Sequence, residues 1–542
     1  MRLGPTSVTL LPKDVDRLDE QRACEEALAT ARALSDAAPA DLDLLRDLAA
    51  AYSDLGHVLR KQRVLDAALA MFEHGIETLR ACRARAPEDL DALRELSFAC
   101  EEAADLLLEQ GELSSALERA RESLDIRRAL VEHRPGDLRA KRDLAFAYEQ
   151  MADVRIERSE LDEARTWLER CLTVRTELSE QDPNESRSKR QLAFLYEELY
   201  DLYRRLGAPG KQEECIASCL ALRVWLHQRR PDDTLSLRNL SAAYSKLGNV
   251  LHKRGAVDAA LGMFEQHLVT ARSVSERVPE DLEAMNTLCA AYDRVADVAR
   301  EQKELSKSLE MAQQSLDLSR ALVERARDEP RWQRGLAISY EKVANVLELR
   351  FELREARTLS ERSLAIRLQL SARDPDNDLW QEDLSVTYER LADLGRMLGE
   401  PTAAEVFITS CLAIRTRLCE RQPDDMRRLH ALSVAYVVVA LLLDAKGEPK
   451  EAAEMLEKSL VLQRQVSQRA PGDLHALHDL SRAYHRLAKQ HATRGARAQA
   501  LEASDRGLAI AESLARLEPR NVMWQVALAD LLRIVTANAL PP

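Results

Sequence analysis

One stretch of the sequence, residues 87–134, reads PEDLDALRELSFACEEAADLLLEQGELSSALERARESLDIRRALVEHR, and its pattern returns every 48 residues. Pro87 and two acidic residues open the unit, Gly111 divides it, and apolar residues recur at helical spacing on both sides of the glycine. Acidic residues favour the first turn of a helix, and glycine adopts the left-handed conformation that ends one. The stretch therefore predicts two helices of about 20 residues each, roughly 30 Å long at 1.5 Å per residue.

The 48-residue period continues through most of the chain. A tyrosine marks the same position in nine of ten units, and Cys100 occupies it in the remaining one. The leucine four residues earlier recurs without interruption from Leu48 to Leu480, and again at Leu528. The repeated tyrosines are Tyr52, Tyr148, Tyr196, Tyr244, Tyr292, Tyr340, Tyr388, Tyr436 and Tyr484. A fixed period of this length is typical of stacked repeat arrays.

We therefore predict an all-α fold, an α-solenoid superhelix of about 22 antiparallel helices. Residues 1–12 form an N-terminal tail, and residues 13–542 form a single solenoid. The solenoid consists of a half repeat at 13–38, ten 48-residue repeats at 39–518, and a capping half repeat at 519–542. Terminal helices that cover both ends are typical of such arrays.

The composition argues against several classes of partner. The chain has 78 Lys and Arg residues against 91 Asp and Glu, a formal net charge of −13, and only 4% aromatic residues. An acidic, aromatic-poor chain suits neither phosphate backbones nor base stacking, so we expect no nucleic-acid partner. The longest apolar run, residues 436–443, is too short for a membrane span, and the start lacks a signal-like apolar segment. We expect a cytoplasmic protein without a membrane partner.

The sequence also lacks the common signatures of catalysis. It contains no H-E-x-x-H, G-x-S-x-G, phosphate-loop or dinucleotide motif, so we expect no enzyme activity and no cofactor. Nine cysteines without paired ligand spacing indicate reduced, structural thiols. A metal-dependent enzyme remains a lesser alternative at one histidine cluster, although no acid or cysteine ligand accompanies it, and we predict no metal. The cluster comprises His475, His478, His485 and His491, with His430 one repeat earlier.

One repeat contains Tyr52-x-x-Leu55-Gly56 followed by Ala68-x-x-x-Phe72, and the first of these motifs recurs at residues 244–248. These motifs resemble the signature of tetratricopeptide repeats. The usual period of that family is 34 residues, and the extra 14 divide into seven on each helix, which keeps each buried stripe in phase. The resemblance covers residues 13–542. It implies a right-handed superhelix whose first helices line a groove that binds proteins and, by analogy, a role in bacterial signalling.

By that resemblance, the groove positions lie one and five residues after the repeated tyrosine. The first row of groove acids is Glu101, Glu149, Glu197, Asp293, Glu341 and Glu389, and the second row is Asp105, Asp153, Asp201, Asp297 and Asp393. Residues four apart share a helix face, so the two rows form one acidic ladder. A concave acidic wall attracts basic segments. This predicts an interaction scaffold or adaptor that binds a basic protein or peptide segment.

Two alternatives stand beside this hypothesis. An arginine row on the same helices could neutralise the ladder and leave it purely structural; it comprises Arg46, Arg94, Arg142, Arg190, Arg238 and Arg334. The protein could also be a regulatory or sensor subunit whose solenoid responds to a peptide or small ligand. The sequence leaves the partner's identity, the pathway and the oligomeric state open.

Two repeats depart from the common pattern and are secondary candidates for contact. Tyr200 and Tyr203 crowd one helix of an aromatic-poor chain, and Tyr200 replaces a small residue of other repeats. Val437 and Leu441 replace the acid pair and could form an exposed apolar patch. Local repacking in the first case, and closure by neighbouring helices in the second, are the alternatives.

Overall fold

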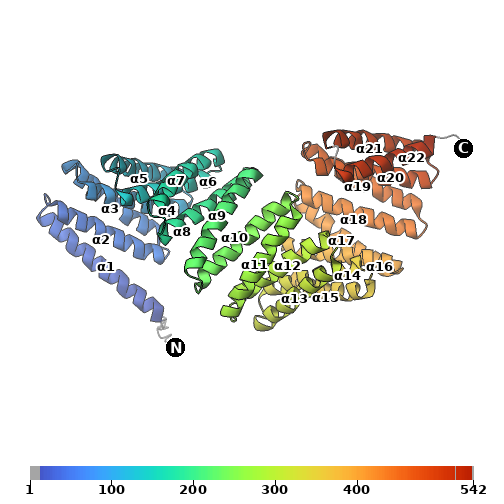
Figure 1. The fold of residues 1–542 in the computed structure, drawn as a ribbon, viewed down its shortest axis with the longest axis horizontal. Coiled ribbons are helices and arrows are strands. Elements are labelled where there is room, and N and C mark those ends of the chain that lie inside the picture. The colour runs from blue at the N-terminus through green and yellow to red at the C-terminus, as the bar shows by residue number, and fades with distance from the viewer. Residues whose placement is uncertain (1–11, 519–520, 540–542) are drawn as a thin grey trace, which may run out of the picture. The chain divides into compact units, whose positions relative to one another are not determined.

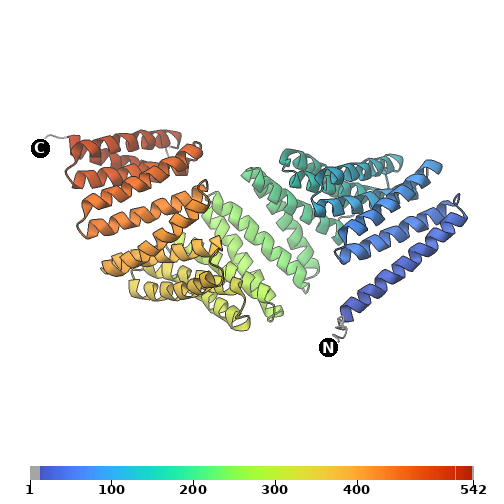
Figure 2. The same cartoon turned by 180° about the vertical axis from the view of Figure 1, so that it is seen from behind.

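The computed structural model describes residues 12–518 and 521–539, and these residues form 22 α-helices and no β-strand. Within each part of the chain, consecutive helices such as α2 and α3 or α18 and α19 are joined by short turns and pack side by side (Figure 1). The same succession of helix pairs is visible from behind in Figure 2. The all-α solenoid and its helix number are therefore confirmed.

The chain divides into two compact units, Met1–Thr270 and Ala271–Pro542, and the division falls inside α11. The first unit contains α1 (Pro12–Ala37), α2 (Leu42–Lys61), α3 (Leu65–Arg85), α4 (Leu90–Gln110), α5 (Leu113–His133), α6 (Leu138–Glu157), α7 (Leu161–Gln181), α8 (Ser186–Arg205), α9 (Pro209–Arg229), α10 (Thr234–Lys253) and most of α11 (Val257–Arg277). The second unit continues with α12 (Leu282–Glu301), α13 (Leu305–Arg325), α14 (Pro330–Leu349), α15 (Leu353–Arg373), α16 (Asp378–Met397), α17 (Pro401–Arg421), α18 (Met426–Ala445), α19 (Pro449–Arg469), α20 (Leu474–Thr493), α21 (Arg497–Leu517) and α22 (Val522–Ala539). The single solenoid over 13–542 and its repeat boundaries remain a prediction.

Local chemistry sets the helix ends. Asp89 caps α4 by accepting hydrogen bonds from the backbone N–H groups of Asp91 and Ala92 at its N-terminus. Gly111 ends α4 at a φ of 80°, in the left-handed region that glycine adopts without steric cost. The turn between the two helices of each repeat has this conformation at the same register throughout. Its residues are Arg63, Gly111, Ser159, Gly207, Gly255, Lys303, Phe351, Gly399, Gly447 and Gly495.

Close packing between the paired helices explains the repeated small residue after the leucine. A Cβ atom added to Gly56 would lie 2.7 Å from Cε1 of Phe72, and one added to Gly248 would lie 2.6 Å from Cε1 of Phe264. A phenylalanine on the second helix therefore requires a glycine on the first, because the interior is close-packed. The nine cysteines are all free thiols, and eight of them are buried.

The even-numbered helices α2–α20 are the first helices of the repeats, and the odd-numbered helices α3–α21 are the second. Contacts that skip one helix are few, and the larger sets of them among the described elements join first helices: α4 and α6 in the first unit, and α16 and α18, and α20 and α22, in the second. Elements on the inner side of a curved stack lie closest together. The first helices therefore form the inner layer of each unit, and this layer holds the acidic ladder.

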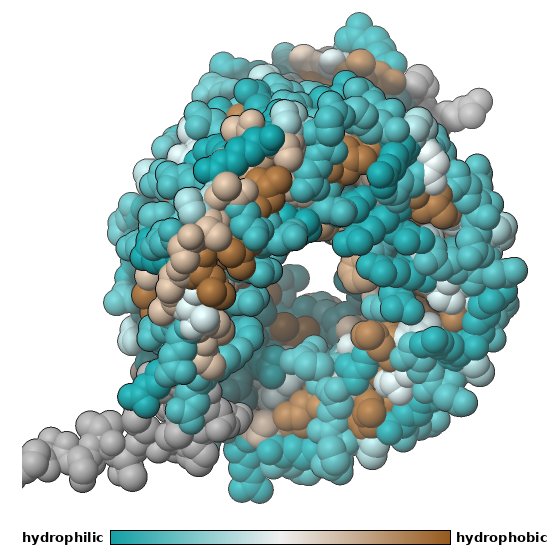
Figure 3. Space-filling model, turned by 90° about the vertical axis from the view of Figure 1, so that its left-hand side faces the viewer, coloured by the Kyte–Doolittle hydropathy of each residue, from teal (hydrophilic) through white to brown (hydrophobic). Residues whose placement is uncertain are grey.

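Hydrophilic residues cover most of the surface seen in Figure 3, and hydrophobic residues appear between them in patches. One helix is unusually apolar: α18 is long and apolar enough to cross a membrane by length and composition alone. Half of its most apolar window is buried inside the protein, and core helices satisfy the same criterion. Its apolar residues pack against α17 and α19.

Candidate functional site

The glutamates of the first row each form an ion pair with an arginine on the second helix of their own repeat. The N–O distance is 2.6 Å between Arg175 and Glu149, and 2.8 Å in both Arg223–Glu197 and Arg367–Glu341. Arg127–Glu101 and Arg415–Glu389 are equivalent pairs. All five arginines are almost completely buried. A buried guanidinium requires such a partner, since leaving one buried charge unpaired is strongly destabilising.

The same arginines also join one repeat to the next. Arg127 Nη1 donates to the backbone oxygen of Asp143 on α6 at 2.9 Å, and Arg415 Nη1 donates to that of Ala431 on α18 at 2.7 Å. Each of these arginines thus links both helices of its own repeat with the first helix of the following one. The first-row glutamates therefore stabilise the stack and offer few free lone pairs to a partner.

Sequence reasoning missed these arginines, although a signal for them exists. Each glutamate of the first row is followed after 26 residues by an arginine, as Glu149 is by Arg175. Asp293, the aspartate of this row, has Ser319 at that spacing. Two positions that change together from repeat to repeat, as the glutamate and the arginine do, are expected to be in contact. A partner on the second helix cannot be found by comparing only residues on one face of the first helix.

The arginine row on the first helices pairs elsewhere. Arg46 binds Glu95 at 2.7 Å, and Arg334 binds Asp383 at 2.6 Å. Arg94 and Arg142 contact Asp137 and Glu185, the residues that precede α6 and α8. These four arginines pair with acids outside the ladder, whereas the first-row glutamates pair with buried arginines of the second helices.

The second row is linked to the following repeat, at the position two residues after the repeated tyrosine. Gln150 Nε2 donates to Asp105 Oδ1 at 2.8 Å, and Lys342 Nζ lies 2.8 Å from Asp297 and 3.5 Å from Asp293. Lys246 lies 3.6 Å from Glu197 and 4.0 Å from Asp201. Asp393 pairs with Arg396 on its own helix at 3.4 Å. The next first helix thus supplies a neutral donor to Asp105 and a lysine to Asp201 and Asp297, whereas Asp393 is paired on its own helix.

Asp153 is the exception, because Glu198 occupies the position that is a lysine at residues 246 and 342. Within the described part of the chain, neither Asp153 nor Glu198 forms an ion pair. Both residues reach solvent. Burial in the inner layer, together with the charges of Glu149 and Asp105, raises the pKa of Asp153 to about 7. Burial, Glu149 and Asp153 raise the pKa of Glu198 to about 8.

Exposed phenylalanines stand three residues before the first-row glutamates of α4, α6 and α8. Phe194 lies four residues before Glu198, and Phe146 seven residues before Asp153, spacings that put each pair on one helix face. The ring of Phe146 lies 5.0 Å from Cζ of Arg175, and that of Phe194 lies 5.0 Å from Cζ of Arg223. Phe194 is 54% exposed. Cation–π contacts of this kind hold an aromatic ring at the surface. We call Asp153, Glu198, Phe146 and Phe194 the α6–α8 face.

The secondary candidates lie in different environments. Tyr200 and Tyr203 are buried in the core of the first unit, and the Tyr203 hydroxyl donates to Glu169 at 2.8 Å. Val437 is also buried, whereas Leu441 is 45% exposed. The tyrosines are accommodated by local repacking, and Leu441 alone presents a side chain to a partner. A binding role for these four residues stays a prediction.

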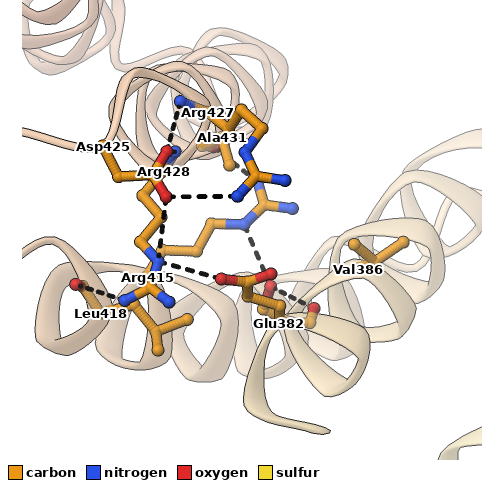
Figure 4. A pocket seen from close by; sticks show the side chains of 9 residues that line it. Glu382, Val386, Arg415, Leu418, Asp425, Arg427, Arg428 and Ala431 are labelled. Atoms are coloured by element: carbon orange, nitrogen blue, oxygen red, sulfur yellow. Dashed lines mark hydrogen bonds and ion pairs between the residues drawn. The ribbon is translucent and has the colours of Figure 1, made fainter. Parts of the chain in front are cut away.

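A pocket of about 210 Å³ lies between α16, α17 and α18 and contains three arginines (Figure 4). Arg428 Nε lies 3.0 Å from Glu382, and Arg427 Nη2 lies 3.5 Å from Asp425. Arg415 is held by Glu389. Every cation that lines this pocket therefore has an acidic partner in the protein itself.

Within residues 12–518 and 521–539, no group of three or more His, Cys, Asp or Glu side chains is placed to hold a metal ion. His478 and His491 are buried in α20, where burial lowers the pKa of both imidazoles.

Comparison with known proteins adds the following. A family model for a tetratricopeptide repeat matches residues 48–81. None of the curated proteins compared with the sequence matches it. The solved structures that are similar to it include the following three. BtubC (BKLC) from P. vanneervenii is 17% identical, with a TM-score of 0.37 over 48% of this chain and 92% of its own. The apo form of RapI is 11% identical, with a TM-score of 0.48 over 78% and 99%. A signal-transduction ATPase with numerous domains and a tetratricopeptide repeat sensor, from Pyrococcus horikoshii, is 14% identical, with a TM-score of 0.41 over 75% and 54%.

Proposed function

Because this chain is a tetratricopeptide-type repeat protein, we propose that it is an interaction scaffold whose α6–α8 face binds a basic segment of a partner protein. Repeats of this type generally serve as scaffolds or sensors for protein partners, and function resides in the site that a given array carries. The observation that supports the proposal is Glu198, an acid at the position from which a lysine neutralises the ladder at residues 246 and 342.

The neutralised repeats show where the partner's cation would lie. Lys342 sits between Asp293 and Asp297, which occupy the same positions in their repeat as Glu149 and Asp153. In the α6–α8 face the corresponding place is occupied by Glu198, and the nearby cation that acts on it, Arg175, is already bound to Glu149. A lysine or arginine of a partner beside Glu198 would remove the repulsion that raises the pKa of Asp153 and Glu198.

The phenylalanines add an apolar component to the same face. Phe146 and Phe194 are exposed beside the two free acids. Aromatic faces bind both the aliphatic stems and the charged heads of lysine and arginine. The face is part of a packed helical layer, so binding requires little ordering on its side. We therefore expect the partner segment to carry basic and apolar residues together.

Glu198→Lys is the variant that tests the proposal, because it supplies the missing lysine from within the chain. The matched control is Glu180→Lys on α7, which makes the same charge change at an exposed residue that forms no ion pair in the described structure. The first-row acids are left intact, because reversing Glu149 or Glu197 would leave Arg175 or Arg223 buried without a partner.

The readout is fluorescence anisotropy with a labelled 12-residue peptide in which lysine alternates with leucine, beside a peptide with glutamate in place of lysine. We expect the wild type and Glu180→Lys to bind the basic peptide alike, and Glu198→Lys to bind it at least about tenfold more weakly. Equal affinity of the two variants, or binding of both peptides by the wild type, would refute the assignment.

A further inference from the structure

A second pocket, of about 520 Å³, lies in the second unit between α20 and α22. Its α20 wall carries Arg482, Arg486 and Lys489, and its α22 wall carries apolar residues that include Met523 and Val526. Met523 and Val526 are both exposed. A pocket with one cationic wall and one apolar wall is unexpected in a chain with a formal net charge of −13.

Among the residues that the structure describes, none of the three cations of this pocket forms an ion pair, although Asp479, one turn or more away on α20, acts on Arg486 electrostatically. The only acid that lines the pocket is Asp530, and its carboxylate pairs with Arg533 at 2.9 Å. Burial and the neighbouring Arg482 lower the pKa of Arg486. Asp479 and Asp530 therefore offset only part of the positive charge of this wall, in contrast to the pocket of α16–α18, where Arg415, Arg427 and Arg428 are all in ion pairs.

The register of the repeats explains the excess of positive charge. Arg486 occupies the position of Lys246 and Lys342, which bind the acids of the preceding repeat. The corresponding acids before Arg486 are replaced by Val437 and Leu441. The cation is retained here without its acids, which is the reverse of the α6–α8 face, where the acid is retained without its cation.

We infer that the pocket between α20 and α22 binds an acidic peptide segment of a partner protein, with carboxylates on Arg482, Arg486 and Lys489 and apolar side chains on the α22 wall. The three cations span seven residues of one helix, or roughly 10 Å at 1.5 Å per residue. This spread fits several carboxylates along a chain better than one small ion. Inorganic phosphate has no apolar part, so it would not contact the adjoining Met523 and Val526.

The inference does not depend on the proposed function, because it concerns the other unit, other residues and the opposite charge. Its test uses the full-length chain and an array of 12-residue peptides in which Asp or Glu alternates with Leu, Ile or Phe. The variant is Arg482→Glu/Lys489→Glu, since both residues are exposed. The matched control is Arg417→Glu/Lys450→Glu, which makes the same charge change at exposed residues of α17 and α19. Far-UV circular dichroism and thermal melting establish that both variants are folded.

We expect saturable binding of acidic–apolar peptides by the wild type and the control, and at least about tenfold weaker binding by Arg482→Glu/Lys489→Glu. Replacing Leu, Ile and Phe with serine should also weaken binding, and millimolar inorganic phosphate should not displace the peptide. Three outcomes would overturn the inference: no saturable binding by the wild type, equal affinity of the variant and the control, or displacement by phosphate with no effect of the serine replacements. The last outcome would indicate a site for a free anion.

Discussion

At the residue scale, the first-row glutamates and the unpaired acids Asp153 and Glu198 have opposite effects on stability. Glu149 neutralises Arg175, which is almost completely buried, whereas Asp153 reaches solvent and adds repulsion. Four residues separate these two carboxylates on α6. Whether such a carboxylate stabilises the fold therefore depends on whether a neighbouring helix supplies a cation for it. Its own exposure to the groove does not decide this.

Glu149→Gln should destabilise the first unit, because it leaves the guanidinium of Arg175 charged and buried without a carboxylate. Removing one member of a buried pair costs about 3 kcal/mol or more. The measurement is urea unfolding followed by far-UV circular dichroism, compared by midpoint because long repeat arrays need not unfold in two states. Asp153→Asn, on the same helix, should not lower the midpoint. A smaller loss for Glu149→Gln than for Asp153→Asn would contradict the structural role of the first row.

The pKa values of Asp153 and Glu198 predict a pH dependence of stability. In the folded chain they are raised to about 7 and about 8, whereas unfolded carboxyl groups titrate near pH 4. Between pH 4 and 8 the folded chain therefore binds more protons, so the stability contribution of these groups is fully present below pH 4 and is lost as the pH rises through 7 and 8.

The double variant Asp153→Asn/Glu198→Gln removes this loss. Its thermal midpoint should exceed that of the wild type by more at pH 8 than at pH 5, with the difference reduced by added salt because both groups reach solvent. A gain that is the same at both pH values would show that the two carboxyls titrate independently of folding.

The sequence predicted the acidic ladder but not its division into neutralised and free parts. The positions of Glu101 to Asp393 follow from period and helical spacing, which are properties of one helix. The pairing of Glu149 with Arg175, and the acid at Glu198, depend on contacts between helices and on the register of one repeat against the next. Phe146 and Phe194 were not recognised either, because apolar residues on an amphipathic helix are ordinarily assigned to the core.

At the scale of the element, substitutions in the turn between paired helices measure how much its left-handed backbone conformation affects the stability of the fold. Phe351 has a φ of 63° and is 79% exposed, so its side chain contributes little packing while its backbone is held in the left-handed region. Phe351→Gly should stabilise the second unit by about 1 kcal/mol and raise its thermal midpoint.

Gly447 provides the reciprocal test at the same register of another repeat. It has a φ of 80°, and an added Cβ would meet no atom within 4 Å. Gly447→Ala should therefore lower the thermal midpoint through the backbone alone. If both substitutions shifted the midpoint in the same direction, conformational strain at this turn would not be the cause.

Helix ends were predictable because single residues determine them. Pro, Asp and Gly at fixed positions cap or interrupt a helix through their own backbone and side-chain chemistry, as Asp89 and Gly111 do for α4. The packing around Tyr200 was harder to predict from the sequence. It depends on how Ile216 and Gln212 on α9 accommodate the ring, and helical periodicity carries no information about the fit between side chains.

At the scale of the whole molecule, the chain forms two compact units although its period is continuous. The division falls within α11, a helix of ordinary length with no proline or turn at the boundary. A repeat pattern reports local spacing only, so it does not indicate that the chain divides into two units within α11. The two candidate sites lie on opposite sides of this division, on α6 and α8 in one unit and on α20 and α22 in the other.

This arrangement predicts that the two sites bind independently. Energetic effects at sites that share no partner residues usually add to within about 0.5 kcal/mol, which corresponds to roughly a twofold change in affinity. Glu198→Lys should therefore leave the affinity for an acidic–apolar peptide unchanged within about twofold, and Arg482→Glu/Lys489→Glu should leave the affinity for the lysine–leucine peptide unchanged. Raising the salt concentration should weaken both interactions, since each joins opposite charges at a solvent-accessible face. Anisotropy titrations of both variants with both peptides at two salt concentrations measure all of these effects. A loss of both affinities in either variant would mean that the two units respond as one body, and the chain would then resemble a sensor that changes state more than a scaffold that holds two partners.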